Sequence, residues 1–175
     1  RRVLFRSGLI PSGEADLAEW LIKQNPHIAD RLAIAFSEAK NSTARGEYEP
    51  LRQLFRLFAD NINKADGTAA HEILHHAERM MPVEVQEGIL AEWQRQWDAT
   101  YKAATPEVKE AMRNMLAAAM GNEKAHSQVA SDFRSGKLDY QQHYQLYSPS
   151  EFWTVNATRI LQGRYAARDS WAQRA

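Results

Sequence analysis

Two histidines and a glutamate form the pattern His71-Glu72-x-x-His75 within the stretch Thr68–Pro82. If this stretch is helical, His71 and His75 lie one turn apart and point in the same direction. Two neutral imidazoles at that spacing can bind one metal ion. Glu72 lies beside them and can accept a proton from a metal-bound water. The spacing therefore indicates a metal site that activates water.

The residues around this motif predict a helix. Residues 66–68 (Asp-Gly-Thr) are turn and N-cap types, and Pro82 is a typical helix stop. Apolar side chains recur at helical spacing, namely Ile73, Leu74, Ala77, Met80 and Met81. One face of the helix can therefore pack into a core, while another carries His71, His75 and Glu78.

Composition limits the other possibilities. The chain has 175 residues, enough for one domain with a core, and its 22 basic and 22 acidic side chains give a net charge of zero. This balance gives no electrostatic reason to expect nucleic acid or a membrane surface as a partner. The absence of cysteine leaves His, Asp and Glu as the possible metal ligands. No signal peptide and no membrane-spanning run is evident, so we expect a cytoplasmic protein.

The first seven residues read R-R-V-L-F-R-S. This string resembles the translation of a common sequencing-adapter oligonucleotide, and we expect it to be an artefact. Residues 8–175 are then expected to form a single domain that is a fragment of a longer protein.

Several other segments have recognisable signals. Apolar periodicity, caps and prolines predict helices over residues 14–24, 83–99, 105–120 and 123–133, and one that begins at residues 148–151. Residues 31–37 suit a strand slightly better than a helix, and residues 51–58 suit either.

A catalytic zinc needs a third protein ligand besides the two histidines. Glu78 shares their face, but it lies about 10 Å along the helix from His71, which is too far for the same ion. The remaining candidates are Glu151, Glu123, His126 and His143. Glu151 is expected in the first turn of a helix, where local structure holds it in place. That position also suits an acid that merely complements the helix dipole, so spacing alone does not decide.

Three segments carry a resemblance to a known family. Leu54–Phe58, a polar loop and the His71–His76 run look like the edge strand and active helix of zincin metallopeptidases, and residues 45–50 resemble the turn before that strand. Residues 148–153 (Ser-Pro-Ser-Glu-Phe-Trp) resemble the helix whose glutamate completes the metal site of gluzincin-type members. The chain is thus similar, over roughly residues 30 to 165, to zincin-like domains of large polyvalent proteins of phages and conjugative elements. It departs from many zincins in carrying Leu74 where a glycine is common.

The resemblance implies a zinc metallopeptidase that cleaves a polypeptide substrate and forms part of a larger multidomain chain. Its Zn²⁺ would be bound by His71, His75 and Glu151, with Glu72 as the general base. The implied fold class is α+β and predominantly helical, with a small sheet packed on the HExxH helix and a helical C-terminal half. Further side chains could stabilise the transition state or orient the ligands: Tyr144, Tyr147, His143, His76 and Glu78.

Two other functions fit the same residues. Glu72-x-x-His75 and Glu123-x-x-His126 are both E-x-x-H motifs, and two such motifs with two further glutamates form the di-iron site of some helical bundles. Glu92 and Glu151 could supply those glutamates, but His71 would then have no role. Alternatively, the chain is an inactive interaction module of a larger protein, although such a module has no chemical need for Glu72.

Overall fold

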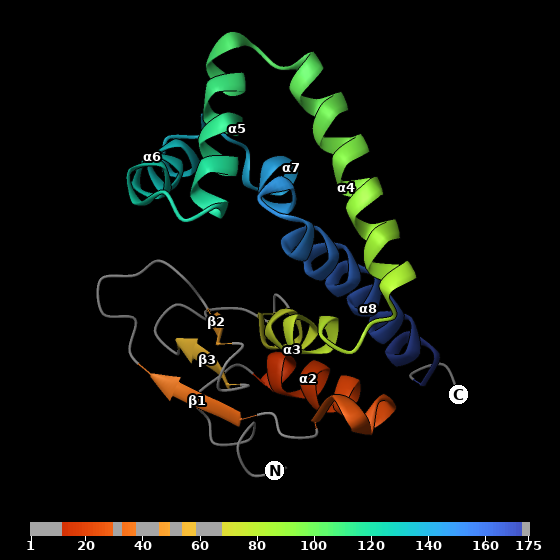
Figure 1. Cartoon of the computed structure of the whole chain (residues 1–175). Coiled ribbons are helices and arrows are strands. Elements are labelled where there is room, and N and C mark those ends of the chain that lie inside the picture. Colours follow the sequence, from red (N-terminus) through yellow and green to blue (C-terminus); the bar gives the residue numbers. More distant parts are fainter. Residues whose placement is uncertain (1–11, 30–32, 38–45, 50–53, 59–67, 173–175) are drawn as a thin grey trace. The chain divides into compact units, whose positions relative to one another are not determined.

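The structure is a computed structural model. It describes residues 12–29, 33–37, 46–49, 54–58 and 68–172, and the side chains of residues 15–27 and 68–164. Residues 1–7 lie outside this part. The chain divides into two compact units, one formed by Arg1–Met80 with Ala157–Ala175 and the other by Met81–Asn156. The first unit contains the HExxH motif (Figure 1).

Two helices form the described core of the first unit. α2 (Ser12–Gln24) packs on α3 (Thr68–Glu78), and a 3-10 turn, η1 (Pro26–Ala29), follows α2. Both helices bury small and branched apolar residues: Leu17, Ala18, Leu21, Ala69, Ala70 and Ile73. Small residues allow two helices to approach closely. The prediction of a helix at the HExxH motif is confirmed, but the helix ends at Glu78, four residues before Pro82, and Met80 is exposed.

The backbone between these helices contains three short strands, β1 (Ala33–Ser37), β2 (Gly46–Glu49) and β3 (Leu54–Phe58). Their order is β1-β3-β2, with β1 parallel and β2 antiparallel to β3. β3 therefore pairs on both sides, and the expectation that it is an edge strand is wrong. Residues 46–49, expected to form a turn, are β2. Strand order depends on pairings that a single strand's sequence does not encode.

The expected α+β fold class is also corrected. The residues whose side chains are described, 15–27 and 68–164, are 85% helical and contain no strand and no sheet. A sheet packed on the HExxH helix is therefore not supported by these residues, and the three strands are described by their backbone alone. Strands lie within the segments 31–37 and 51–58, as β1 and β3, whereas the residues from Thr68 onward supply one helix signal after another.

The second unit consists of helices with well-defined starts. α4 (Val83–Ala103) is followed by α5 (Pro106–Ala119), α6 (Glu123–Arg134), α7 (Tyr140–His143) and the 3-10 turn η3 (Tyr144–Leu146). Side chains of Thr105, Asn122 and Asp139 accept hydrogen bonds from backbone N–H groups at the starts of α5, α6 and α7. α4 extends four residues beyond its predicted end.

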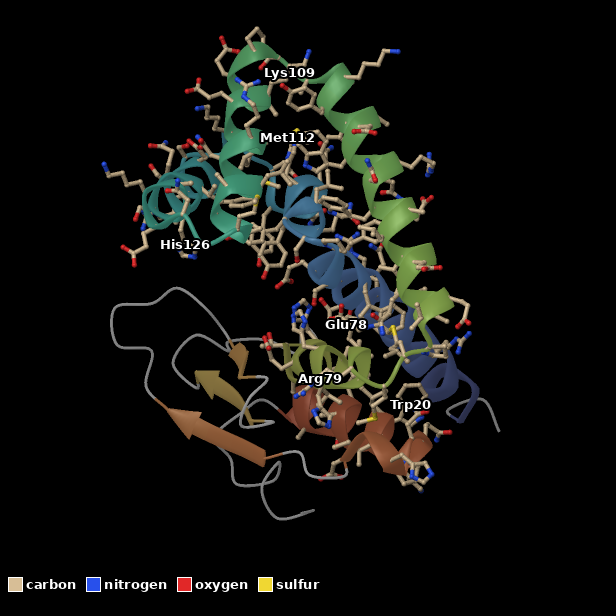
Figure 2. The ribbon with its side chains drawn as sticks, in the orientation of Figure 1. Trp20, Glu78, Arg79, Lys109, Met112 and His126 are labelled. Carbon is tan, nitrogen blue, oxygen red and sulfur yellow. The ribbon has the colours of Figure 1, made fainter. Side chains whose placement is uncertain are left out.

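A continuous apolar cluster holds the second unit together. α5 packs on α6. The buried residues of the cluster come from these two helices, from the turn after α6 and from η3: Ala111, Met112, Met115, Ala118, Ala125, Val129, Leu138 and Leu146. Figure 2 shows Met112 on α5, facing the unit's interior. The aromatic rings of Trp93, Trp97 and Tyr101 on α4 cover this cluster.

The last helix, α8 (Pro149–Ala172), begins in the second unit and ends in the first. It continues past Arg164 as far as Ala172. None of the helices in the described part of the chain is long and apolar enough to span a membrane.

Candidate metal centre

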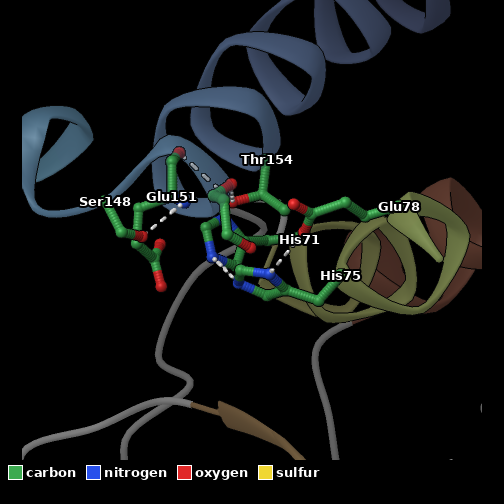
Figure 3. Close-up of polar contacts among 7 residues, drawn as sticks. His71, His75, Glu78, Ser148, Glu151 and Thr154 are labelled. Atoms are coloured by element: carbon green, nitrogen blue, oxygen red, sulfur yellow. Dashed lines mark hydrogen bonds and ion pairs between the residues drawn. The ribbon is translucent and has the colours of Figure 1, made fainter. Parts of the chain in front are cut away.

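The two histidines of the motif turn the same ring nitrogen toward one point. His71 Nε2 lies 3.1 Å from His75 Nε2, and the rings meet edge to face with centroids 4.8 Å apart (Figure 3). Two nitrogen ligands of a tetrahedral zinc, each bound at about 2.0–2.1 Å, lie about 3.3 Å apart. The helical spacing of i and i+4 therefore produces a nitrogen pair with the separation that zinc requires.

Glu151 is the third residue of this group. One ligand atom from each of His71, His75 and Glu151 lies within 4.8 Å of the others, and all three side chains are half-buried. This limit is about 1.5 Å wider than the separation of donors around a tetrahedral zinc. Two imidazole nitrogens and one carboxylate oxygen are a donor set typical of catalytic zinc.

The start of α8 fixes the backbone of Glu151. Ser148 Oγ accepts a hydrogen bond from the Glu151 N–H at 3.1 Å. The buried Thr154 donates its hydroxyl to the carbonyl oxygens of Ser150 and Glu151, at 3.1 and 3.2 Å. Ser148 and Thr154 were not predicted as site residues. The Ser-x-x-Glu spacing of a capping box is the sequence signal that identifies Ser148.

The remaining polar residues of α3 lie at different depths. Glu72 is only 6% exposed, and His76 is 3% exposed. Burying an ionised carboxylate at this depth has a substantial desolvation cost. The carboxylate of Glu72, the residue next to His71, is buried in this way. His76 is an interior residue of α3 and does not belong to the group formed by His71, His75 and Glu151.

Glu78 approaches the outer nitrogen of the second histidine. Its Oε2 lies 3.9 Å from His75 Nδ1, on the ring edge opposite Nε2 (Figure 3). Glu78 therefore contacts a ligand rather than the ion, as its distance along the helix predicts.

Tyr147 is electrostatically coupled to Glu151. Burial, and then the negative charge of Glu151, raise the pKa of the Tyr147 phenol above its usual value of 10.0. The phenol therefore keeps its proton at neutral pH and can donate a hydrogen bond. Its ring also packs against the apolar cluster of the second unit.

The other predicted donors are engaged in local packing. Tyr144 stacks on Tyr140, with ring centroids 4.6 Å apart and an angle of 14° between the rings, and meets the edge of Phe133. His143 is buried at the end of α7, with Nδ1 3.1 Å from the carbonyl oxygen of Asp139. The contacts of Tyr144 and His143 are those of side chains that hold α6, α7 and η3 together.

The residues of the alternative di-iron site lie elsewhere. Glu123 and His126 are both exposed on α6, and neither belongs to the group of possible metal ligands. Figure 2 labels His126. Glu92 accepts hydrogen bonds from Arg95 at 2.6 and 2.7 Å and from Gln96 at 2.9 Å. These donors lower the pKa of Glu92 to about 2. Glu92 is thus one partner of a surface ion pair, which argues against it as a ligand.

Comparison with protein-family models, with curated proteins and with solved structures gives no match for this chain.

Proposed function

We propose that this protein is a zinc-dependent metallopeptidase whose metal ligands are His71, His75 and Glu151. The observation that carries the proposal is the convergence of the two Nε2 atoms, 3.1 Å apart, with the Glu151 carboxylate in the same group. A zinc site with three protein ligands keeps a fourth position for water or substrate. The motif's resemblance to gluzincin-type peptidases supports the same function.

Zinc, when bound, lowers the pKa of its water to about 7 and polarises the scissile carbonyl group. Glu72 accepts the proton of the attacking water and passes it to the nitrogen of the leaving amine. The water oxygen forms a bond to the carbonyl carbon, the C–N bond breaks, and the products are a carboxylate and an amine. Tyr147 keeps its proton and is our candidate donor to the developing oxyanion, because it lies near enough to Glu151 for that charge to act on its phenol.

The test is metal content and hydrolysis of fluorogenic peptides by the purified chain. We expect about one zinc per chain, because three protein ligands complete one site. Glu72→Gln should keep the zinc and lower kcat by about 10²–10⁴-fold, the usual contribution of a general base. Glu87→Gln, on the exposed surface of α4, is the matched control and should retain full activity.

Other outcomes identify other functions. Zinc without cleavage of any peptide would indicate an inactive interaction module. Two irons per chain, retained in His71→Ala, would indicate the di-iron site. Peptide cleavage that persists in Glu72→Gln would show that another group or a contaminant performs the hydrolysis.

The resemblance also bears on the substrate, the location and the parent protein of this activity. A polypeptide substrate, a cytoplasmic location and membership of a larger phage or conjugative-element protein belong to the proposal. The balanced net charge agrees with a partner that is neither nucleic acid nor membrane.

A further inference from the structure

We infer that Glu78 is a positioning residue that selects Nε2 of His75 as the metal-binding nitrogen. The inference rests on the proposed zinc site and adds a residue that determines how one ligand is presented to the ion. Glu78 does this by attracting the other ring nitrogen, Nδ1.

The geometry of α3 brings the three side chains onto one face. His71, His75 and Glu78 occupy positions i, i+4 and i+7 of a single helix. His75 Nε2 lies 3.1 Å from His71 Nε2, while His75 Nδ1 lies 3.9 Å from Glu78 Oε2. A half-turn of the imidazole would replace both nitrogens by carbons. Only one of the two ring orientations therefore satisfies His71 and Glu78 together.

The same contact selects the tautomer. A neutral imidazole has one N–H and one lone pair, and the metal takes the lone pair. A carboxylate beside Nδ1 favours the proton there, which leaves the lone pair on Nε2. At 3.9 Å the contact is an electrostatic attraction that is longer than a hydrogen bond. The side chains of His75 and Glu78 are only 14% and 30% exposed, so water screens this attraction incompletely.

Helix stability gives no reason for an acid at this position. Glu78 is the last residue of α3, where the helix dipole disfavours negative charge and favours lysine or arginine. Glu78 is also outside the group of possible metal ligands. Its contact with His75 gives the carboxylate a role at the proposed site.

The first test measures zinc affinity at one fixed pH by competition with a chromogenic chelator. Glu78→Ala should bind zinc about 10–100-fold more weakly, the usual effect of removing a group that orients a ligand. Glu78→Gln should retain most of the affinity, because its amide still presents an oxygen to Nδ1–H. Glu87→Ala on α4 is the control and should bind zinc as the unsubstituted chain does.

Glu78→Lys separates positioning from a merely structural role. Lysine at the end of a helix is favourable, so the variant should fold at least as stably by circular dichroism. It should nevertheless bind zinc more weakly, because no acceptor then faces Nδ1. Unchanged zinc affinity in both Glu78→Lys and Glu78→Ala would overturn the inference.

A spectroscopic readout does not require zinc. Two-bond ¹⁵N–¹H spectra of the metal-free chain should show His75 with its proton on Nδ1 and His71 with its proton on Nε2, because the two Nε2 atoms share one hydrogen bond. In Glu78→Ala the population of His75 protonated on Nε2 should rise. If the tautomer does not change while the unsubstituted chain binds zinc, the role of Glu78 is wrong and the proposed function stands. A chain that binds no zinc would overturn both.

Discussion

The Tyr147 phenol lies where its neutral form is favoured. Burial raises its pKa most, and the negative charge of Glu151 adds to the effect. The folded chain therefore binds this proton more tightly than the unfolded chain, whose tyrosine titrates at about 10. The stability that depends on this proton is complete below pH about 10 and is lost as the pH rises through the folded-state pKa.

Replacement of Tyr147 by phenylalanine should remove this alkaline loss. Urea midpoints of both chains, measured from pH about 8 to about 11, should shift in favour of Tyr147→Phe as the pH rises. If the urea midpoints of the two chains differ by the same amount at every pH, the raised pKa of Tyr147 is contradicted. NMR titration should also show a lower Tyr147 pKa in Glu151→Gln, which removes the second cause and leaves burial.

At the level of single elements, the start of α8 connects helix stability with metal binding. Ser148 Oγ caps the backbone N–H of Glu151, so the helix N-terminus and the proposed ligand share one hydrogen bond. Ser148→Ala should destabilise the chain by about 1 kcal/mol, as other lost N-caps do. It should also weaken zinc binding, because the backbone of Glu151 is then held less firmly.

Thr105→Ala is the control for this prediction. Thr105 caps α5 through the N–H of Val108, and its side chain has no contact with the proposed ligands. The two alanine variants should lose similar stability in urea, but only Ser148→Ala should lose zinc affinity. Equal zinc affinity in both would show that the cap does not position Glu151.

Two methionines, Met112 in the middle of α5 and Met120 at its C-cap, test the apolar cluster of the second unit. Met112 is 0% exposed in that cluster, whereas Met120, the residue that ends α5, is 88% exposed. Met112→Ala should cost about 2–5 kcal/mol because it leaves a cavity. Met120→Ala should stay within about 0.5 kcal/mol. Similar unfolding midpoints for the two variants would contradict this assignment of the core.

The elements also show what the sequence could predict. Helices with a local start were predicted to within a few residues, because Thr105-Pro106 and Asn122 act on their own neighbours. The His71–His75 pair is local in the same sense, because helical spacing alone directs both rings to one side. The position of β3 between two strands could not be read from residues 54–58, since it depends on distant partners. The α+β class was expected to include a sheet packed on the HExxH helix. That packing was taken from a resemblance, because the sequence does not show which distant segments contact each other.

For the whole molecule, zinc binding should raise thermal stability. If His71, His75 and Glu151 bind a metal as proposed, an ion that binds the folded chain preferentially stabilises it by mass action. Free zinc at about 100 times its Kd should add about 2.7 kcal/mol. For a chain of this length, that corresponds to a rise in Tm of about 5–10 °C.

Scanning calorimetry with and without a chelator would measure this rise, and three variants separate its causes. His71→Ala should lose the rise, because one of the two nitrogens is gone. Glu151→Ala should lose most of it if the carboxylate is the third ligand, and a full rise in this variant would contradict that assignment. Glu72→Gln should keep the rise and lose peptide hydrolysis, because this residue acts on water rather than on the ion. A Tm that is independent of both zinc and chelator in the unsubstituted chain would contradict the metal site itself.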